Sequence, residues 1–207
     1  MRAPFFSLDG VDGVGKSTQL DLFCAWLSEC GHNVVRCRDP GGTELGEAIR
    51  KILLGHTDLA IAPRSEMLLY MASRAQLVGE VIRPALDAGQ IVVSDRFLLA
   101  NVVYQGHAGS LEVDRLWQIG EVATAGLLPD LTLLLDMDAD AALQRISREA
   151  DRMEARGLSY LRRVRQGFLD EAKRQPERIT IINAAQAVPQ VQQEIRNAAD
   201  AVLAERE

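Results

Sequence analysis

Residues 10–18 have the types and the spacing that binding of a polyphosphate requires. They read Gly-Val-Asp-Gly-Val-Gly-Lys-Ser-Thr, so that Gly10 and Gly15 are separated by four residues and are followed by Lys16 and Ser17. In such a glycine-rich loop, called a P-loop, backbone amides surround phosphate oxygens, the lysine reaches the β- and γ-phosphates, and the serine hydroxyl can ligate Mg²⁺. The segment therefore predicts a phosphate-binding loop.

The loop lies between a predicted strand and a predicted helix, which is the context that the motif needs. Apolar runs typical of strands recur at residues 5–9, 33–38, 90–95, 131–136 and 179–183, with helical stretches between them, one of them over 65–86. This alternation predicts an α/β fold with a parallel sheet covered by helices on both faces. Ligands of such sheets bind beyond the carboxyl ends of the strands.

Composition narrows the class of protein. A chain of 207 residues, 47% hydrophobic and 25% charged, is expected to form one domain, and its net charge of −6 argues against general binding to nucleic acid. No apolar run approaches the roughly 20 residues of a membrane span. The three cysteines lack metal-ligand spacing, and their odd number without a signal peptide predicts a reduced, cytoplasmic setting.

Acidic residues stand at the ends of three predicted strands, at Asp9, Asp39 and Asp95. Each of them alone is typical of a cap or a turn. Asp95 with Arg96 could instead hold the Mg²⁺ shell and a phosphate, although a surface salt bridge explains the pair equally well.

Two groups of residues have the chemistry to bind a nucleoside. Tyr70 and Arg74 are four residues apart on a predicted helix, so a ring and a two-pronged donor would share one face. A core aromatic beside a snorkelling arginine is the alternative. Asn101, Tyr104 and Gln105 could bind a base and a sugar, or could belong to an exposed helix and turn.

Arginines are dense between residues 145 and 165. A solvated helical face and a lid that closes over phosphates account equally well for this run. Its members are Arg145, Arg148, Arg152, Arg156, Arg162, Arg163 and Arg165.

Taken together, residues 10–18, 38–43, 70–74, 95–96, 104–106 and 151–152 resemble the thymidylate kinase family in wording and in order. The resemblance implies transfer of a phosphoryl group from ATP to dTMP with Mg²⁺ as cofactor. It also implies a P-loop NTPase fold with a five-stranded parallel sheet, a single domain over 1–207, a short arginine-rich lid at about 145–157, and a homodimer. Neither nucleic acid nor a membrane is an implied partner.

The resemblance also assigns roles to single residues. Tyr70 matches the ring that stacks on thymine, Arg74 a donor to the base, Tyr104 the ring that crowds the sugar, and Arg96 a phosphate ligand. The implied substrate-binding set is Asp12, Pro40, Arg50, Tyr70, Arg74, Arg96, Asn101, Tyr104 and Gln105. The implied ATP-binding set is Gly10, Val11, Asp12, Gly13, Val14, Gly15, Lys16, Ser17 and Thr18. The metal ligands would be Asp12, Ser17 and Asp95.

Members of the family carry a catalytic arginine either in the P-loop or in the lid. Here the loop position is Gly13, so the resemblance favours Arg148 and Arg152, with Arg145 a weaker candidate. The implied catalytic set is therefore Asp12, Lys16, Arg96, Arg148 and Arg152. Phosphoryl transfer needs alignment and charge compensation, which such a set supplies.

Two other functions remain compatible with the P-loop. One is a kinase of another small nucleotide or nucleoside, against which Tyr70, Arg74, Asn101 and Gln105 are the discriminating residues. The other is a nucleotide-dependent switch without transfer activity, against which the arginine-rich segment argues.

Overall fold

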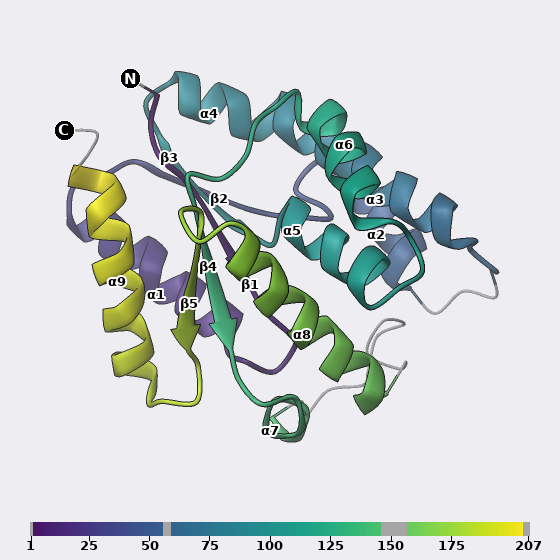
Figure 1. Ribbon diagram of the computed structural model, residues 1–207. Coiled ribbons are helices and arrows are strands. Elements are labelled where there is room, and N and C mark those ends of the chain that lie inside the picture. The colour runs from purple at the N-terminus through teal and green to yellow at the C-terminus, as the bar shows by residue number, and fades with distance from the viewer. Residues whose placement is uncertain (1, 56–58, 146–156, 205–207) are drawn as a thin grey trace.

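Five parallel strands form one sheet in the order β2-β3-β1-β4-β5 (Figure 1). The computed structural model describes residues 2–55, 59–145 and 157–204. The strands are β1 (Phe5–Asp9), β2 (Val34–Arg38), β3 (Ile91–Asp95), β4 (Leu131–Asp136) and β5 (Ile179–Asn183). The predicted five-stranded parallel sheet is confirmed, with β2 and β3 each beginning one residue later than expected.

The register brings the acidic strand ends to one edge of the sheet. β1 lies between β3 and β4, with Leu8 opposite Asp95 and Asp9 opposite Leu134. Side chains of β1 alternate between the two faces, since the Phe6 ring contacts Phe23 of the helix after the P-loop, while the Phe5 ring contacts Phe97 on the other side. The P-loop therefore leaves the centre of the sheet, at its carboxyl edge.

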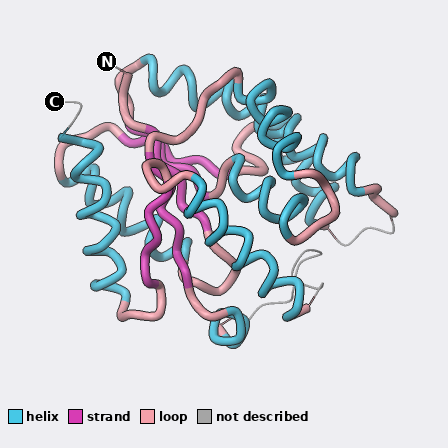
Figure 2. Tube along the Cα trace, viewed as in Figure 1, coloured by secondary structure: helices cyan, strands magenta, loops and turns pink. Residues whose placement is uncertain are grey.

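Helices cover both faces, as Figure 1 and Figure 2 show. On one face α1 (Lys16–Glu29) packs against α9 (Val188–Ala204), and both contact strands. On the other face α8 (Leu158–Arg174) contacts β5 and α4 (Arg83–Asp87) contacts β3. The other elements are α2 (Glu44–Leu54), α3 (Pro63–Leu77), η1 (Val78–Ile82), α5 (Leu98–Asn101), η2 (Val102–His107), α6 (Val113–Thr124) and α7 (Ala139–Gln144). None of the helices described is long and apolar enough to span a membrane.

The helix expected over 65–86 is interrupted by a wider turn. α3 is followed by the π-helical segment η1 and then by α4, and the amide of Arg83 donates to the carbonyl of Val78, five residues back. Pro84 explains this, because it lacks an N–H and its ring would clash with the carbonyl of Glu80 in a regular α-helix. The predicted helical segment over 65–86 is confirmed, although the wider turn within it was not foreseen from the sequence.

Thr43 is the N-cap residue of α2. The Thr43 hydroxyl accepts a hydrogen bond from the amide of Gly46 at 2.9 Å. This cap fixes the start of the helix that carries Arg50 toward the site.

Candidate active site

The P-loop joins β1 to α1, and its glycines have conformations that side chains would oppose. Gly10 has φ 137°, and a Cβ there would lie 2.4 Å from the carbonyl oxygen of Leu135. Gly15 has φ 94° and precedes the first residue of α1. The loop thus approaches β4 closely and presents the N-terminus of a 14-residue helix to an anion.

Two cations converge on one carboxylate of this loop. Lys16 Nζ donates to the carbonyls of Gly10 at 3.0 Å and Val11 at 2.8 Å, and to Asp12 Oδ1 at 3.3 Å. Arg96 donates to the same Gly10 carbonyl at 3.0 Å and to Asp12 Oδ1 at 2.7 Å. Burial opposes ionisation of Asp12, but Lys16 and Arg96 outweigh it and hold the pKa of the carboxyl well below its usual range. Asp12 is therefore an anion between two cations.

Arg96 reaches the loop from an unusual backbone conformation. Its φ is 65°, a left-handed value that few residues other than glycine adopt. Its amide donates to the carbonyl of Leu8, and its guanidinium lies 5.1 Å from the centre of the Tyr104 ring. The surface salt bridge with Asp95 that sequence left open is wrong, because the Arg96 side chain is 16% exposed and pairs with Asp12.

A cavity of about 1010 Å³ opens beside the loop. The predicted loop residues Gly10, Val11 and Val14 do not line it, and the two valine side chains pack into the core. The predicted residues that do line it are Asp12, Gly13, Gly15, Lys16, Ser17, Thr18, Pro40, Arg50, Tyr70, Arg74, Asp95, Arg96, Asn101, Tyr104, Gln105 and Arg145. Arg36 and Arg38 of β2 line it as well, although only their strand, and not their role, was predicted.

Arg74 is the centre of a buried polar network on one side of the cavity. It is 1% exposed and donates to Asp39 Oδ2 at 2.5 Å and to Asn101 Oδ1 at 3.1 Å. Asn101 donates in turn to Gln105 Oε1 at 2.7 Å, and Gln105 donates to Glu66 Oε1 at 2.9 Å. A snorkelling Arg74 and an exposed Asn101–Gln105 segment, the two alternatives from sequence, are both wrong.

Asp39 and Glu66 close this network at its ends. Asp39 was noticed in the sequence for its place after a strand, whereas nothing in the α3 segment distinguishes Glu66 from a surface glutamate. Arg50, on α2, donates to the carbonyl of Pro40 at 2.8 Å. The loop after β2 is therefore bonded both to Arg50 and, through Asp39, to Arg74.

Asp9, at the end of β1, is buried without a hydrogen-bond partner. Neither carboxyl oxygen has one among the described residues, and the side chain is fully buried. Burial raises the pKa of Asp9 to about 7, although Arg96 and Lys16 oppose the shift. Its place at a strand end drew attention in the sequence, but burial could not be inferred from it.

Replacing Asp9 with asparagine is expected to remove a pH dependence of stability. Between pH 4 and pH 7 the folded protein keeps a proton on Asp9 that the unfolded chain, with a pKa of 3.8, has lost. Stability therefore falls as pH rises through this window, by roughly 4 kcal/mol between the pKa of the unfolded chain and that of the folded protein. Urea unfolding at several pH values should show wild type losing stability relative to Asp9→Asn. Parallel profiles for the two proteins would contradict the assignment.

The arginine-rich segment divides into two parts. Arg148 and Arg152 lie outside the described residues, as does nearly all of the lid predicted at 145–157. Arg145 lines the cavity and donates to the carbonyl of Ala184 at 3.4 Å. Arg162 and Arg165, on α8, pair with carboxylates of residues 136–140, which is the solvated face that sequence also allowed.

A phosphate-binding loop that opens into a polar cavity of this size places the protein among the P-loop kinases of small nucleotides. The cavity is at the upper end of ordinary ligand pockets. Lys16 and Arg96 line it together with Arg74, Asn101 and Gln105 of the buried network.

Comparisons with known proteins name the family. The thymidylate kinase family model matches residues 8–195, so the chain belongs to the thymidylate kinase family. A thymidylate kinase of Rhodopirellula baltica is 47% identical over 189 residues, 91% of this chain and 77% of that protein. A thymidylate kinase of Kosmotoga olearia is 44% identical over 193 residues, which are 92% of this chain and 92% of that protein. The crystal structure of thymidylate kinase from Ehrlichia chaffeensis matches with a TM-score of 0.79 and 30% identity over 96% of this chain and 99% of that one.

Proposed function

We propose that this member of the thymidylate kinase family binds dTMP beside Tyr70 and Arg74 and ATP along residues 10–18. The reaction is transfer of the γ-phosphoryl group of ATP to dTMP, which gives dTDP and ADP. The observation that supports this arrangement is the convergence of Lys16 and Arg96 on Asp12, a residue of the same cavity that Tyr70 and Arg74 line. A phosphoryl group that passes from ATP to dTMP would come close to both of these cations.

The chemistry requires alignment and charge compensation more than covalent help. The phosphate oxygen of dTMP is already an anionic nucleophile, so no general base is needed. In the structure Lys16 and Arg96 both donate hydrogen bonds to the carbonyl of Gly10 and to Asp12. We infer that phosphate oxygens take over these donors when nucleotides bind, and that the same cations then stabilise the transferring group.

Mg²⁺ fits the oxygen atoms at the mouth of the P-loop. Asp12 is ionised and half-buried, Ser17 is exposed at the start of α1, and Asp95 lines the same cavity. No cluster of three metal-binding side chains occurs in the described parts of the chain. This agrees with Mg²⁺, which is typically held by one or two carboxylates together with substrate phosphates and water. The ion would neutralise charge on the phosphates, while Asp12 and Ser17 fix its place.

The network around Arg74 provides the means to select a base. Arg74, Asn101 and Gln105 are buried, and they line the cavity on one side, where Tyr70 offers a half-buried ring. Because the two amides already bond to one another and to Arg74 and Glu66, their orientations are fixed before a base arrives. Fixed donors and acceptors discriminate between bases that differ in one polar group. Tyr104, held at the cavity wall, is proposed to exclude a ribose hydroxyl.

The catalytic arginine is proposed to come from the segment 145–157, as family resemblance implies, with Arg148 and Arg152 as the candidates. Arg145 supports this proposal, because it is the first residue of the segment and lines the cavity.

We also propose a homodimer and a cytoplasmic location. Exposed apolar side chains occur on α2, α3 and α6, and α3 contacts both of the other two helices. A second copy of the chain is the partner proposed for this surface, whose members are Leu45, Ile52, Leu68 and Val122. The three cysteines are unpaired, as in proteins of reducing compartments.

A panel of acceptors tests the function. With ATP and Mg²⁺, purified protein is expected to phosphorylate dTMP with a far higher kcat/KM than dUMP, dCMP, dGMP or UMP, as coupled release of ADP would measure. Equal use of all five would contradict the specificity. A variant with both Tyr70→Ala and Arg74→Ala distinguishes a dTMP kinase from a kinase of another nucleotide or nucleoside. An unchanged KM for dTMP in this variant would mean that the acceptor does not bind beside these two residues.

A further inference from the structure

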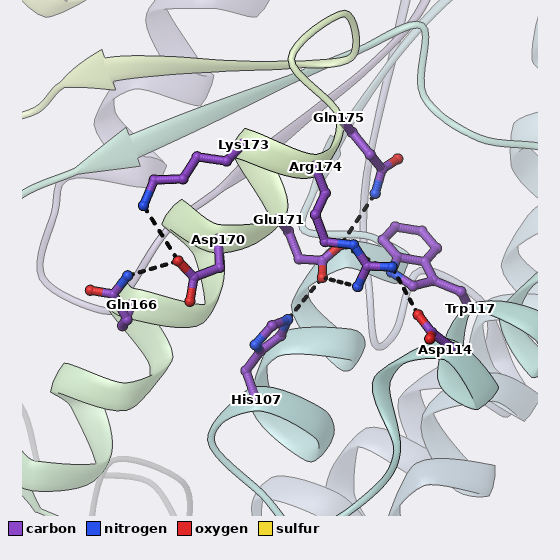
Figure 3. Close-up of polar contacts among 9 residues, drawn as sticks. All are labelled: His107, Asp114, Trp117, Gln166, Asp170, Glu171, Lys173, Arg174 and Gln175. Carbon is purple, nitrogen blue, oxygen red and sulfur yellow. Dashed lines mark hydrogen bonds and ion pairs between the residues drawn. The ribbon is translucent and has the colours of Figure 1, made fainter.

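A buried carboxylate links α8 to two neighbouring helical segments, α6 and η2. Glu171, on α8, has a fully buried side chain, and both of its oxygens accept hydrogen bonds (Figure 3). Oε1 bonds with His107 Nε2 at 2.8 Å and Arg174 Nη1 at 3.1 Å. Oε2 bonds with Trp117 Nε1 at 3.1 Å and Gln175 Nε2 at 3.3 Å. A buried charge is stabilised in this way only when its acceptor sites are filled.

One of these four partners connects the carboxylate to the nucleotide site. His107 is the last residue of η2, the π-helical segment that also carries Tyr104 and Gln105. Those two residues line the cavity, whereas no residue of α6, which carries Trp117, does so. Arg174 and Gln175 belong to the end of α8 itself. Of the four hydrogen bonds, only that of His107 therefore leads into a cavity-lining segment.

α8 holds η2 at more than this one point. The Tyr160 hydroxyl donates to the carbonyl of Tyr104 at 3.0 Å, and the Tyr104 ring contacts those of Tyr160 and Phe168. Gly167 allows the close approach between them, since a Cβ there would lie 2.5 Å from the Cβ of His107. The bond between Glu171 and His107 fixes the end of η2 that Tyr160 leaves free. π-helical turns are rare and occur frequently at functional sites, which agrees with a role for η2 in the site.

We propose that Glu171 is a positioning residue for the acceptor nucleotide, acting through His107. Its carboxylate holds the end of η2, and η2 in turn sets where Tyr104 and Gln105 meet the sugar and the base. Neither residue touches the cavity, so the effect is on the binding of dTMP and not on the phosphoryl transfer itself. The inference rests on the proposed placement of dTMP beside η2.

His107→Ala tests this, with Arg174→Met as its matched control. Both variants remove a partner from the same oxygen of Glu171, but Arg174 lies three residues along the same helix and leaves η2 untouched. His107→Ala is expected to raise the KM for dTMP roughly tenfold, with kcat and the KM for ATP near wild type. Arg174→Met is expected to lower the melting temperature while the KM for dTMP stays within about twofold. His107→Gln, whose amide can donate to Glu171, should recover most of the loss.

The same measurements can overturn the proposal. A wild-type KM for dTMP in His107→Ala would contradict it, as would an equal rise in Arg174→Met, since that would indicate a general effect of the carboxylate on stability. If His107→Ala changed the KM values for ATP and dTMP alike, positioning of the acceptor would also be wrong. The wild-type acceptor panel is independent of these variants. If the wild-type protein phosphorylates dTMP and His107→Ala has the same KM for dTMP, the positioning role of Glu171 is contradicted while the proposed function stands.

Discussion

Replacing Lys16 with alanine is expected to lower kcat for dTMP phosphorylation by roughly 10³-fold or more. Lys16 is buried at the start of α1, where its ammonium bonds to two P-loop carbonyls and to Asp12. Because Lys16 is buried, its charge is little shielded by water and acts strongly on a phosphate. The same burial, with the nearby Arg96, lowers the pKa of Lys16. No other cation of the described loop residues can take its place. Single-turnover kinetics with saturating ATP would measure the loss.

Lys51→Ala is the control for this variant, because Lys51 is an exposed lysine in the last turn of α2. It should leave kcat unchanged. Arg148→Ala and Arg152→Ala belong in the same series, since a lid arginine is expected to contribute a similar factor. A Lys16→Ala enzyme that kept kcat within tenfold of wild type would contradict the role given to the lysine. An unchanged kcat in both arginine variants would contradict the assignment of the catalytic arginine to Arg148 or Arg152.

The strands and the loop were predictable because their signals are local. β1, β3 and β4 are buried on both faces, so Phe5–Asp9, Ile91–Asp95 and Leu131–Asp136 contain long apolar runs that end in an acid. The glycines of the P-loop mark positions of positive φ. Family resemblance then supplied roles for residues whose local pattern alone was ambiguous, such as Tyr70 and Arg74.

The pairings that organise the site were not predictable, because they depend on how distant elements pack. Asp39 and Arg74 are 35 residues apart and meet only because α3 packs against the turn that follows β2. Glu171 lies in a helix so rich in charge that its sequence suggests an exposed position, yet the imidazole and indole donors around it come from other helices. Asp9 shows the same limit, since the sequence places it at a strand end and only the sheet order buries it.

Replacing Arg74 with methionine is expected to destabilise the fold by about 3–5 kcal/mol, because it leaves Asp39 buried without its ionic partner. The two side chains are 1% and 0% exposed, and their closest atoms are 2.5 Å apart. Methionine fills much of the volume of the arginine stem, so the loss reflects charge and hydrogen bonds more than a cavity. Urea unfolding would measure it. The KM for dTMP should rise in the same variant, since Arg74 also orients Asn101.

Two comparisons separate the buried charge from other causes. Burial already raises the pKa of Asp39 and Arg74 opposes that rise, so without Arg74 the carboxyl takes up a proton more readily. The loss in Arg74→Met should therefore grow as pH rises above 3.8, the ordinary pKa of an aspartate, because ionising the buried acid costs more as pH rises. Adding Asp39→Asn should recover part of the stability and abolish that pH dependence. Arg115→Met, which breaks an exposed pair with Glu112, should cost less than about 1 kcal/mol. If Arg74→Met were no more destabilising than this surface control, the ion pair would not be what stabilises the buried network beside the cavity.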